Sequence, residues 1–154
     1  MGPCEAFAPT LLRSPHPWHA GTSVAEPNTH LNIDRSLCGE IVELGEGRAQ
    51  VELKTDERMA ADPQGLVHGG FVFGAADYAA MLAVNDPNVV LGAAETRFLA
   101  PVRVGQSVAV GATITETKGR KRKVEVEAKV DETVVLTGTL TCFVLDHHVL
   151  ESSS

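Results

Sequence analysis

The chain lacks the features that mark most membrane, metal-binding and nucleic-acid-binding proteins. No apolar run in its 154 residues approaches the roughly 20 that span a bilayer. Its three cysteines are scattered without the spacing of metal ligands. The net charge of −7 argues against general binding to nucleic acid or to anionic membranes. Aromatic residues make up only 5% and hydrophobic residues 44%, so we expect one aliphatic, alanine-rich core.

The N-terminus also lacks a recognisable targeting signal. No basic segment is followed by an apolar run, as a signal peptide would require. Ala6 stands where a myristoylation signal has Ser or Thr. With few, scattered cysteines, a reducing cytoplasmic setting is the simplest fit.

Composition divides the chain into three parts. Residues 1–30 carry five of the eight prolines and no sustained periodicity, which predicts a flexible N-terminal extension. Residues 31–146 form the predicted domain, and residues 147–154 form a polar C-terminal tail. Five of the six histidines, His30 among them, fall in the tails or linkers and receive no chemical role.

The sequence of the domain predicts one long helix among antiparallel strands. Residues 69–84 contain no Lys, Arg or Glu, and a helix apolar on nearly every face has to be wrapped by protein. Period-two alternation and turn residues predict the strands at 38–44, 49–54, 89–98, 107–117, 123–130 and 134–145. This is an α+β arrangement. One sheet covers only one side of the helix, so we expect a second copy of the chain to cover the rest.

A single carboxylate, Asp77, interrupts the apolar helix, which opens with His68, Gly69 and Gly70. A buried carboxylate is costly without a partner or a chemical role, so Asp77 is a candidate for acid–base or nucleophilic chemistry. Unpaired N–H groups at a helix N-terminus can also stabilise a developing oxyanion.

These residues resemble the hotdog-fold acyl-CoA thioesterases of the 4-hydroxybenzoyl-CoA thioesterase superfamily, in particular the PaaI-type branch. The family pattern G-x-x-H-G-G followed by Asp stands here as residues 65–70 and Asp77, and F-L-A-P-V-R-V-G at 98–105 is also typical. The resemblance spans about residues 31–145 and implies a hotdog fold that hydrolyses acyl-CoA. It implies no metal and no cofactor, since coenzyme A is part of the substrate, and a homodimer that pairs again into a homotetramer.

The resemblance implies Asp77 as the catalytic carboxylate, either general base or nucleophile. We assign the N–H of Gly70, together with that of Gly69, to the oxyanion hole, and expect His68 to orient this loop. The nine residues from His68 to Asp77 rise about 13–14 Å along a helix. One carbonyl cannot touch both ends, so the two motifs would meet only across two antiparallel helices from different subunits.

Other residues are candidates for contacts with the water molecule, the thioester or the acyl group. Relatives often carry Asn or Gln six residues before the histidine, to orient water or thioester, but this chain has Asp62, with Gln64 nearby. Thr96 is a candidate for the opposite side of the thioester. The acyl pocket is expected among apolar helix residues: Phe71, Phe73, Tyr78, Met81 and Leu82.

The basic cluster at residues 118–123 is the only one in this acidic chain. Lys and Arg bind phosphate well, so the cluster is a candidate for the phosphates of coenzyme A. Strand alternation would place only about half of it on one face. The candidates are Lys118, Arg120, Lys121 and Arg122.

Two other functions remain open. One is a non-catalytic acyl-CoA sensor of the same fold, although residues 1–30 are too proline-rich for a helix-turn-helix module. The other is a hotdog dehydratase or hydratase. One branch of those carries Glu fourteen residues after the histidine, where this chain has Leu82.

Overall fold

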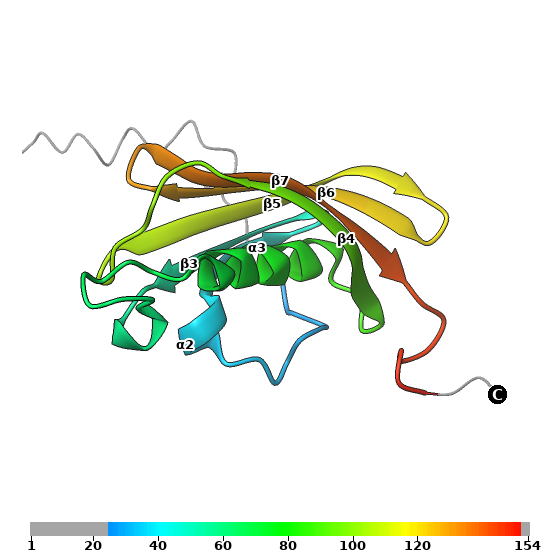
Figure 1. Cartoon of the computed structure of the whole chain (residues 1–154). Coiled ribbons are helices and arrows are strands. Elements are labelled where there is room, and N and C mark those ends of the chain that lie inside the picture. Colours follow the sequence, from blue (N-terminus) through cyan, green and yellow to red (C-terminus); the bar gives the residue numbers. More distant parts are fainter. Residues whose placement is uncertain (1–24, 152–154) are drawn as a thin grey trace, which may run out of the picture.

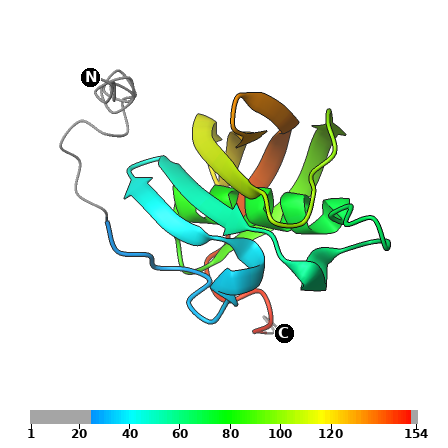
Figure 2. The same cartoon turned by 90° about the vertical axis from the view of Figure 1, so that its left-hand side faces the viewer.

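One long helix packs against one antiparallel sheet in the computed structural model, which describes residues 25–151. The helix, α3, spans Gly69–Val84. The strands are β2 (Glu40–Gly45), β3 (Arg48–Lys54), β4 (Val89–Phe98), β5 (Ser107–Lys118), β6 (Lys121–Val130) and β7 (Thr133–Val144). They pair in the order β2-β3-β5-β6-β7-β4, and the sheet curves over the helix (Figures 1 and 2). The predicted α+β arrangement is confirmed.

Helix α3 has the predicted bounds because its ends are determined locally. Asn85 adopts a left-handed conformation with a φ of 53°, and its N–H donates to the Met81 carbonyl at 2.8 Å. This is a common way to end a helix, and Asn tolerates it better than most residues. On the side facing the sheet, Ala75, Ala79 and Leu82 have no exposed surface. Small alanine side chains let the helix approach the strands closely.

The strands follow the predicted alternation. Val108, Val110 and Ala112 of β5 face the core, and the residues between them face away. The first strand begins at Glu40 rather than at Cys38, because Cys38 ends a short helix, α2 (Arg35–Cys38). Asp34 caps that helix by accepting the Ser36 N–H at 2.9 Å, an arrangement that favours helix over strand.

The packed part of the chain begins before residue 31. We call residues 25–34 the N-terminal segment. The Ala25 N–H donates to the Leu44 carbonyl at 2.9 Å. The Asn28 N–H donates to Asn85 Oδ1 at 2.7 Å. The last six residues of the predicted extension are therefore bonded to the domain, whereas its first 24 lie outside the described residues.

The side of α3 away from the sheet is more open. Gly70, Gly74 and Asp77 recur there at helical spacing, and a Cβ on Gly74 would meet no atom within 4 Å. Strand β4 forms one edge of the sheet, with residues 92–95 exposed. No helix within residues 25–151 is long and apolar enough to cross a membrane.

Candidate active site

The start of α3 presents two backbone N–H groups without acceptors. Within the described residues, no hydrogen bond engages the N–H of Gly69 or of Gly70, whereas the next N–H, of Phe71, donates to the His68 carbonyl at 3.0 Å. The His68 side chain does not cap the helix. Free N–H groups and the helix dipole together favour negative charge at this position.

Both glycines also fit their surroundings closely. A Cβ on Gly69 would stand 3.3 Å from the Phe98 ring, and a Cβ on Gly70 would stand 3.1 Å from the His68 ring. Gly69 therefore permits close packing against the end of β4, and Gly70 leaves room for the imidazole. The exposed His68 ring lies beside Gly70, and the backbone N–H of His68 donates to the Met59 carbonyl at 2.9 Å.

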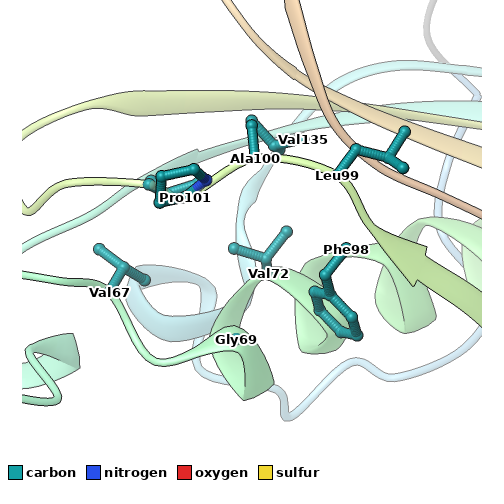
Figure 3. Close-up of a pocket in the computed structure, with 9 residues that line it drawn as sticks. Val67, Gly69, Val72, Phe98, Leu99, Ala100, Pro101 and Val135 are labelled. Carbon is teal, nitrogen blue, oxygen red and sulfur yellow. The ribbon is translucent and has the colours of Figure 1, made fainter.

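An apolar cavity of about 380 Å³ opens beside the helix start (Figure 3). Residues from three segments line it: Val67, Gly69 and Val72 around the helix start, Phe98–Val102 at the end of β4 and just after it, and Val135 of β7. It differs from the predicted acyl pocket, because Tyr78, Met81 and Leu82 are fully buried core residues. The sequence pattern could not separate core from cavity on a helix that is apolar all round.

Asp77 lies about two turns further along α3 and does not line this cavity. Its Oδ1 atom is buried and has no hydrogen-bond partner among the described residues. Burial raises the pKa of this carboxyl, and the charge of His30 partly offsets the rise. Within one chain this carboxyl group is thus about two turns of helix away from the free N–H groups.

His30 is a neighbour of Asp77 that the sequence did not reveal. Burial lowers the pKa of His30, and the charge of Asp77 opposes this. The His30 ring centroid lies 6.3 Å from that of Tyr78, the residue after Asp77. A histidine 47 positions before the carboxylate, in a segment without periodicity, carries no sequence signal for this contact.

Asp62 and Gln64 lie in the loop that precedes α3, at its Gly69 end. Asp62 Oδ1 accepts the N–H groups of Gln64 at 2.9 Å and Leu66 at 3.1 Å. This carboxylate therefore stabilises its own loop. Together with Arg103 and neighbours, the two residues line a hollow of about 300 Å³, which shares Pro101 with the apolar cavity.

Thr96 lies on β4, opposite Gly138 of β7. A Cβ on Gly138 would stand 2.6 Å from Thr96 Cγ2, so this glycine makes room for the threonine side chain. Phe98, two residues along the same strand, shares its face and packs on Gly69. Thr96 is thus on the helix-facing side of the edge strand.

The basic cluster lies at the opposite end of the molecule from Gly69. The Val144 N–H donates to the Arg120 carbonyl, and Val144 pairs with Val89, just past the end of α3. Several of its cations contact their own chain: Arg120 binds Asp146, Arg122 binds the carbonyls of Gly119 and Lys121, and Lys123 lies 3.9 Å from Glu116. Lys118 and the Lys121 side chain have no such contact within residues 25–151.

Within residues 25–151, no three His, Cys, Asp or Glu side chains are grouped so that they could hold a metal ion. Cys142 is buried, and burial raises its pKa to about 12, so this thiol is neutral at neutral pH.

Two curated relatives resemble most of the chain. A methylthioribose-1-phosphate isomerase of Aquifex aeolicus is 53% identical over 119 residues, covering 77% of this chain. The transcription factor FapR of Caldanaerobacter subterraneus is 26% identical over 123 residues, covering 79% of this chain. The chain spans only 26% of the length of the first and 62% of the second.

Solved structures share most of the architecture. Protein PH1136 of Pyrococcus horikoshii has a TM-score of 0.83 and 51% identity, covering 84% of this chain and 100% of its own. A mutant of the phenylacetic acid degradation protein PaaI of Thermus thermophilus has a TM-score of 0.66 and 26% identity, covering 72% of this chain and 96% of its own. The profile of the Thioesterase superfamily matches residues 64–137, from the loop before α3 into β7. The chain therefore belongs to the thioesterase superfamily and has the hotdog fold.

Proposed function

We propose that this protein hydrolyses acyl-CoA thioesters at a site shared between two copies of the chain. The supporting observation is the pairing of free N–H groups at Gly69 and Gly70 with an apolar cavity. The buried carboxylate of Asp77 lies about two turns away, without a partner among the described residues. A thioester needs both an oxyanion site and a base or nucleophile.

In this proposal two α3 helices pack antiparallel, and each site takes its N–H groups from one copy and Asp77 from the other. The acyl group enters the apolar cavity, and its carbonyl oxygen accepts the N–H of Gly70, aided by that of Gly69. Asp77 removes a proton from water that attacks the carbonyl carbon, or attacks that carbon itself to form an anhydride that water then opens. The C–S bond breaks, and the thiolate of coenzyme A takes up a proton.

The test is a thiol-release assay over short-chain, long-chain and aryl-CoA substrates, with wild type and the Asp77→Asn variant. We expect turnover by the wild type and a loss of about 10²- to 10⁴-fold in kcat for the variant, the range for removal of an acid–base group. Circular dichroism and acyl-CoA binding serve as controls for folding. Full activity of the Asp77→Asn variant would contradict the proposal.

A purified heterodimer tests the shared site. One chain carries Asp77→Ala, and the other carries Gly70→Pro. If the sites are shared, one site holds both defects and the other neither, so about half of the wild-type activity per dimer returns, while either mutant homodimer is inactive. If each site lies within one chain, the heterodimer is inactive too.

The similarity to FapR favours a second candidate, an acyl-CoA-binding regulator. In that case the apolar cavity would hold the ligand without hydrolysis. The same assay separates the two functions, because a regulator would bind acyl-CoA tightly and release no thiol.

A further inference from the structure

The N-terminal segment brings one histidine to the side of Asp77. The segment is bonded to the end of α3, where Asn85 accepts the Asn28 N–H at 2.7 Å and donates to the Glu26 carbonyl at 3.1 Å. It then continues to His30, whose ring lies 6.3 Å from that of Tyr78. These contacts along the last two turns of α3 place His30 beside Tyr78, the residue that follows Asp77 in the helix.

The orientation of His30 is constrained. The Thr29 hydroxyl lies 2.8 Å from His30 Nδ1, and Thr29 itself is only 5% exposed. His30 has a φ of 54°, a region that residues other than glycine adopt rarely and that often accompanies functional sites. Because Nδ1 is engaged by Thr29, Nε2 is the nitrogen left to bind another group. No hydrogen bond to Nε2 is present within residues 25–151.

Asp77 and His30 are close without being bonded to each other. Each acts electrostatically on the other, yet no hydrogen bond joins them in the described chain. A water molecule commonly bridges two polar groups that lie near each other without a direct hydrogen bond. Asp62, which stands where relatives often carry a water-positioning amide, uses its carboxylate to hold its own loop.

We propose that His30 positions the attacking water for Asp77 of the same chain, through a hydrogen bond between Nε2 and the water oxygen. This rests on the proposed thioesterase function. The water proton goes to Asp77, its oxygen bonds to the carbonyl carbon, and the departing thiolate recovers a proton as the C–S bond breaks. In the anhydride route, the same water attacks the anhydride instead. His30 acts by positioning and forms no covalent bond.

The other titratable groups near the pair are two thiols, His148 and, beside Tyr78, Arg35 of α2. Asp77 also acts on the thiols of Cys38 in α2 and Cys142 in β7, and burial raises the pKa of both, so both are neutral at neutral pH. His148 shares with His30 a hollow of about 290 Å³ formed with the start of β4. Among the described residues, only His30 contributes a charge that lowers the pKa of Asp77.

The contact can be tested without any activity. An NMR titration of the histidine C–H signals compares wild type with Asp77→Asn, and His147, in the exposed tail, is the internal control. Removing the carboxylate should lower the pKa of His30, because its negative charge stabilises the imidazolium, and should leave His147 unchanged. An unchanged pKa of His30 would show that the two groups do not face each other and would overturn the proposal.

The role in hydrolysis is tested by kinetics of His30→Ala and His30→Asn, with His147→Ala as the matched control. We expect His30→Ala to lower kcat roughly 10- to 100-fold with little change in KM, as misplacement of a reacting group does. His30→Asn should recover part of this, because its amide can still bind water. The acidic limb of the kcat/KM profile should move to higher pH, since the pKa of Asp77 rises without the histidine cation.

Three outcomes would count against this role. A raised KM with unchanged kcat would assign His30 to substrate binding, and activity loss that follows a lowered Tm would assign it to folding; either overturns the proposal. A wild type that hydrolyses no acyl-CoA would overturn the thioesterase function and, with it, this role. The NMR titration would still decide whether His30 and Asp77 face each other, so the two failures are distinguishable.

Discussion

The two sides of α3 differ in what determines their residue types. On the side facing the sheet, Ala75, Ala79 and Leu82 are completely buried, and their identity follows from packing alone. On the other side, Gly70 and Gly74 leave the backbone open, and Asp77 holds a buried oxygen without a partner in the described chain. Packing within one chain explains the first side and leaves the second unexplained.

This difference indicates where the chemistry lies. A hydrophobic core stabilises a domain through residues such as alanine, valine and leucine. An unpaired carboxylate or a free N–H group in that core would destabilise it. Such groups persist where a substrate or a second protein surface completes them. The open side of α3 therefore carries the candidate site, and the sheet side holds it in place.

Apart from the loss of the Asp77 carboxylate itself, the largest expected effect comes from removing one N–H on the open side. In Gly70→Pro the ring removes the N–H, and proline is tolerated in the first turn of a helix. We expect kcat to fall about 10²- to 10³-fold, as for loss of one oxyanion donor. Gly70→Ala is the matched control, because it keeps the N–H while its methyl group meets the His68 ring at 3.1 Å. Equal losses in both variants would point to steric disturbance instead.

A substitution on the sheet side should affect stability rather than chemistry. Leu82→Ala removes a fully buried side chain, and we expect the free energy of unfolding to fall by about 2–5 kcal/mol. Leu31, which is 68% exposed, provides the control, with a change within about 0.5 kcal/mol for Leu31→Ala. Denaturant titration measures both, and kcat per folded molecule should stay near wild type. A stable but inactive Leu82→Ala would break the division between the two sides.

How far the sequence predicted each side follows from the same division. The bounds of α3 and β4, and most of the sheet, followed from periodicity and turn residues, because burial on one face of an element repeats locally. The motif residues of the open side were found through their unusual types. The position of His30 and the lining of the cavity were not predicted, since both depend on contacts between distant segments.

The lining of the apolar cavity illustrates this limit. Phe98 and Val135 line it from two strands, and Val67 lines it from the loop before the helix. Each reads as an ordinary strand or loop residue, and only the close approach of Phe98 to Gly69 joins them. Tyr78 and Met81 looked equally suitable in sequence but face the core.

Neutralising the Asp77 carboxylate should also have a smaller effect on the stability of the protein. Burial raises the pKa of Asp77 above its value in the unfolded chain, so ionisation opposes folding. The cost is absent below the unfolded pKa, where both states are protonated, and complete above the folded pKa. Asp77→Asn should therefore raise the free energy of unfolding at neutral pH, and this gain should disappear in acid. Thermal unfolding across pH measures it, and a gain that is independent of pH would contradict it.

The smallest expected effect concerns the far end of the open side, where the basic cluster lies. In an antiparallel pair of helices, this end of one copy lies toward the Gly70 end of the other, so its cations can approach the phosphates of bound coenzyme A. Lys118 and Lys121 are the informative pair, because Arg120 and Arg122 already contact their own chain. Each exposed charge contributes at most about 1 kcal/mol, so the Lys118→Ala/Lys121→Ala variant should raise KM several-fold with kcat unchanged. Because salt screens exposed charges, the difference from wild type should shrink at high ionic strength. The control is Lys54→Ala, which removes an exposed cation at the opposite end of the sheet. An equal rise in KM for this variant would show that net charge, and not the position of the basic cluster, determines the effect.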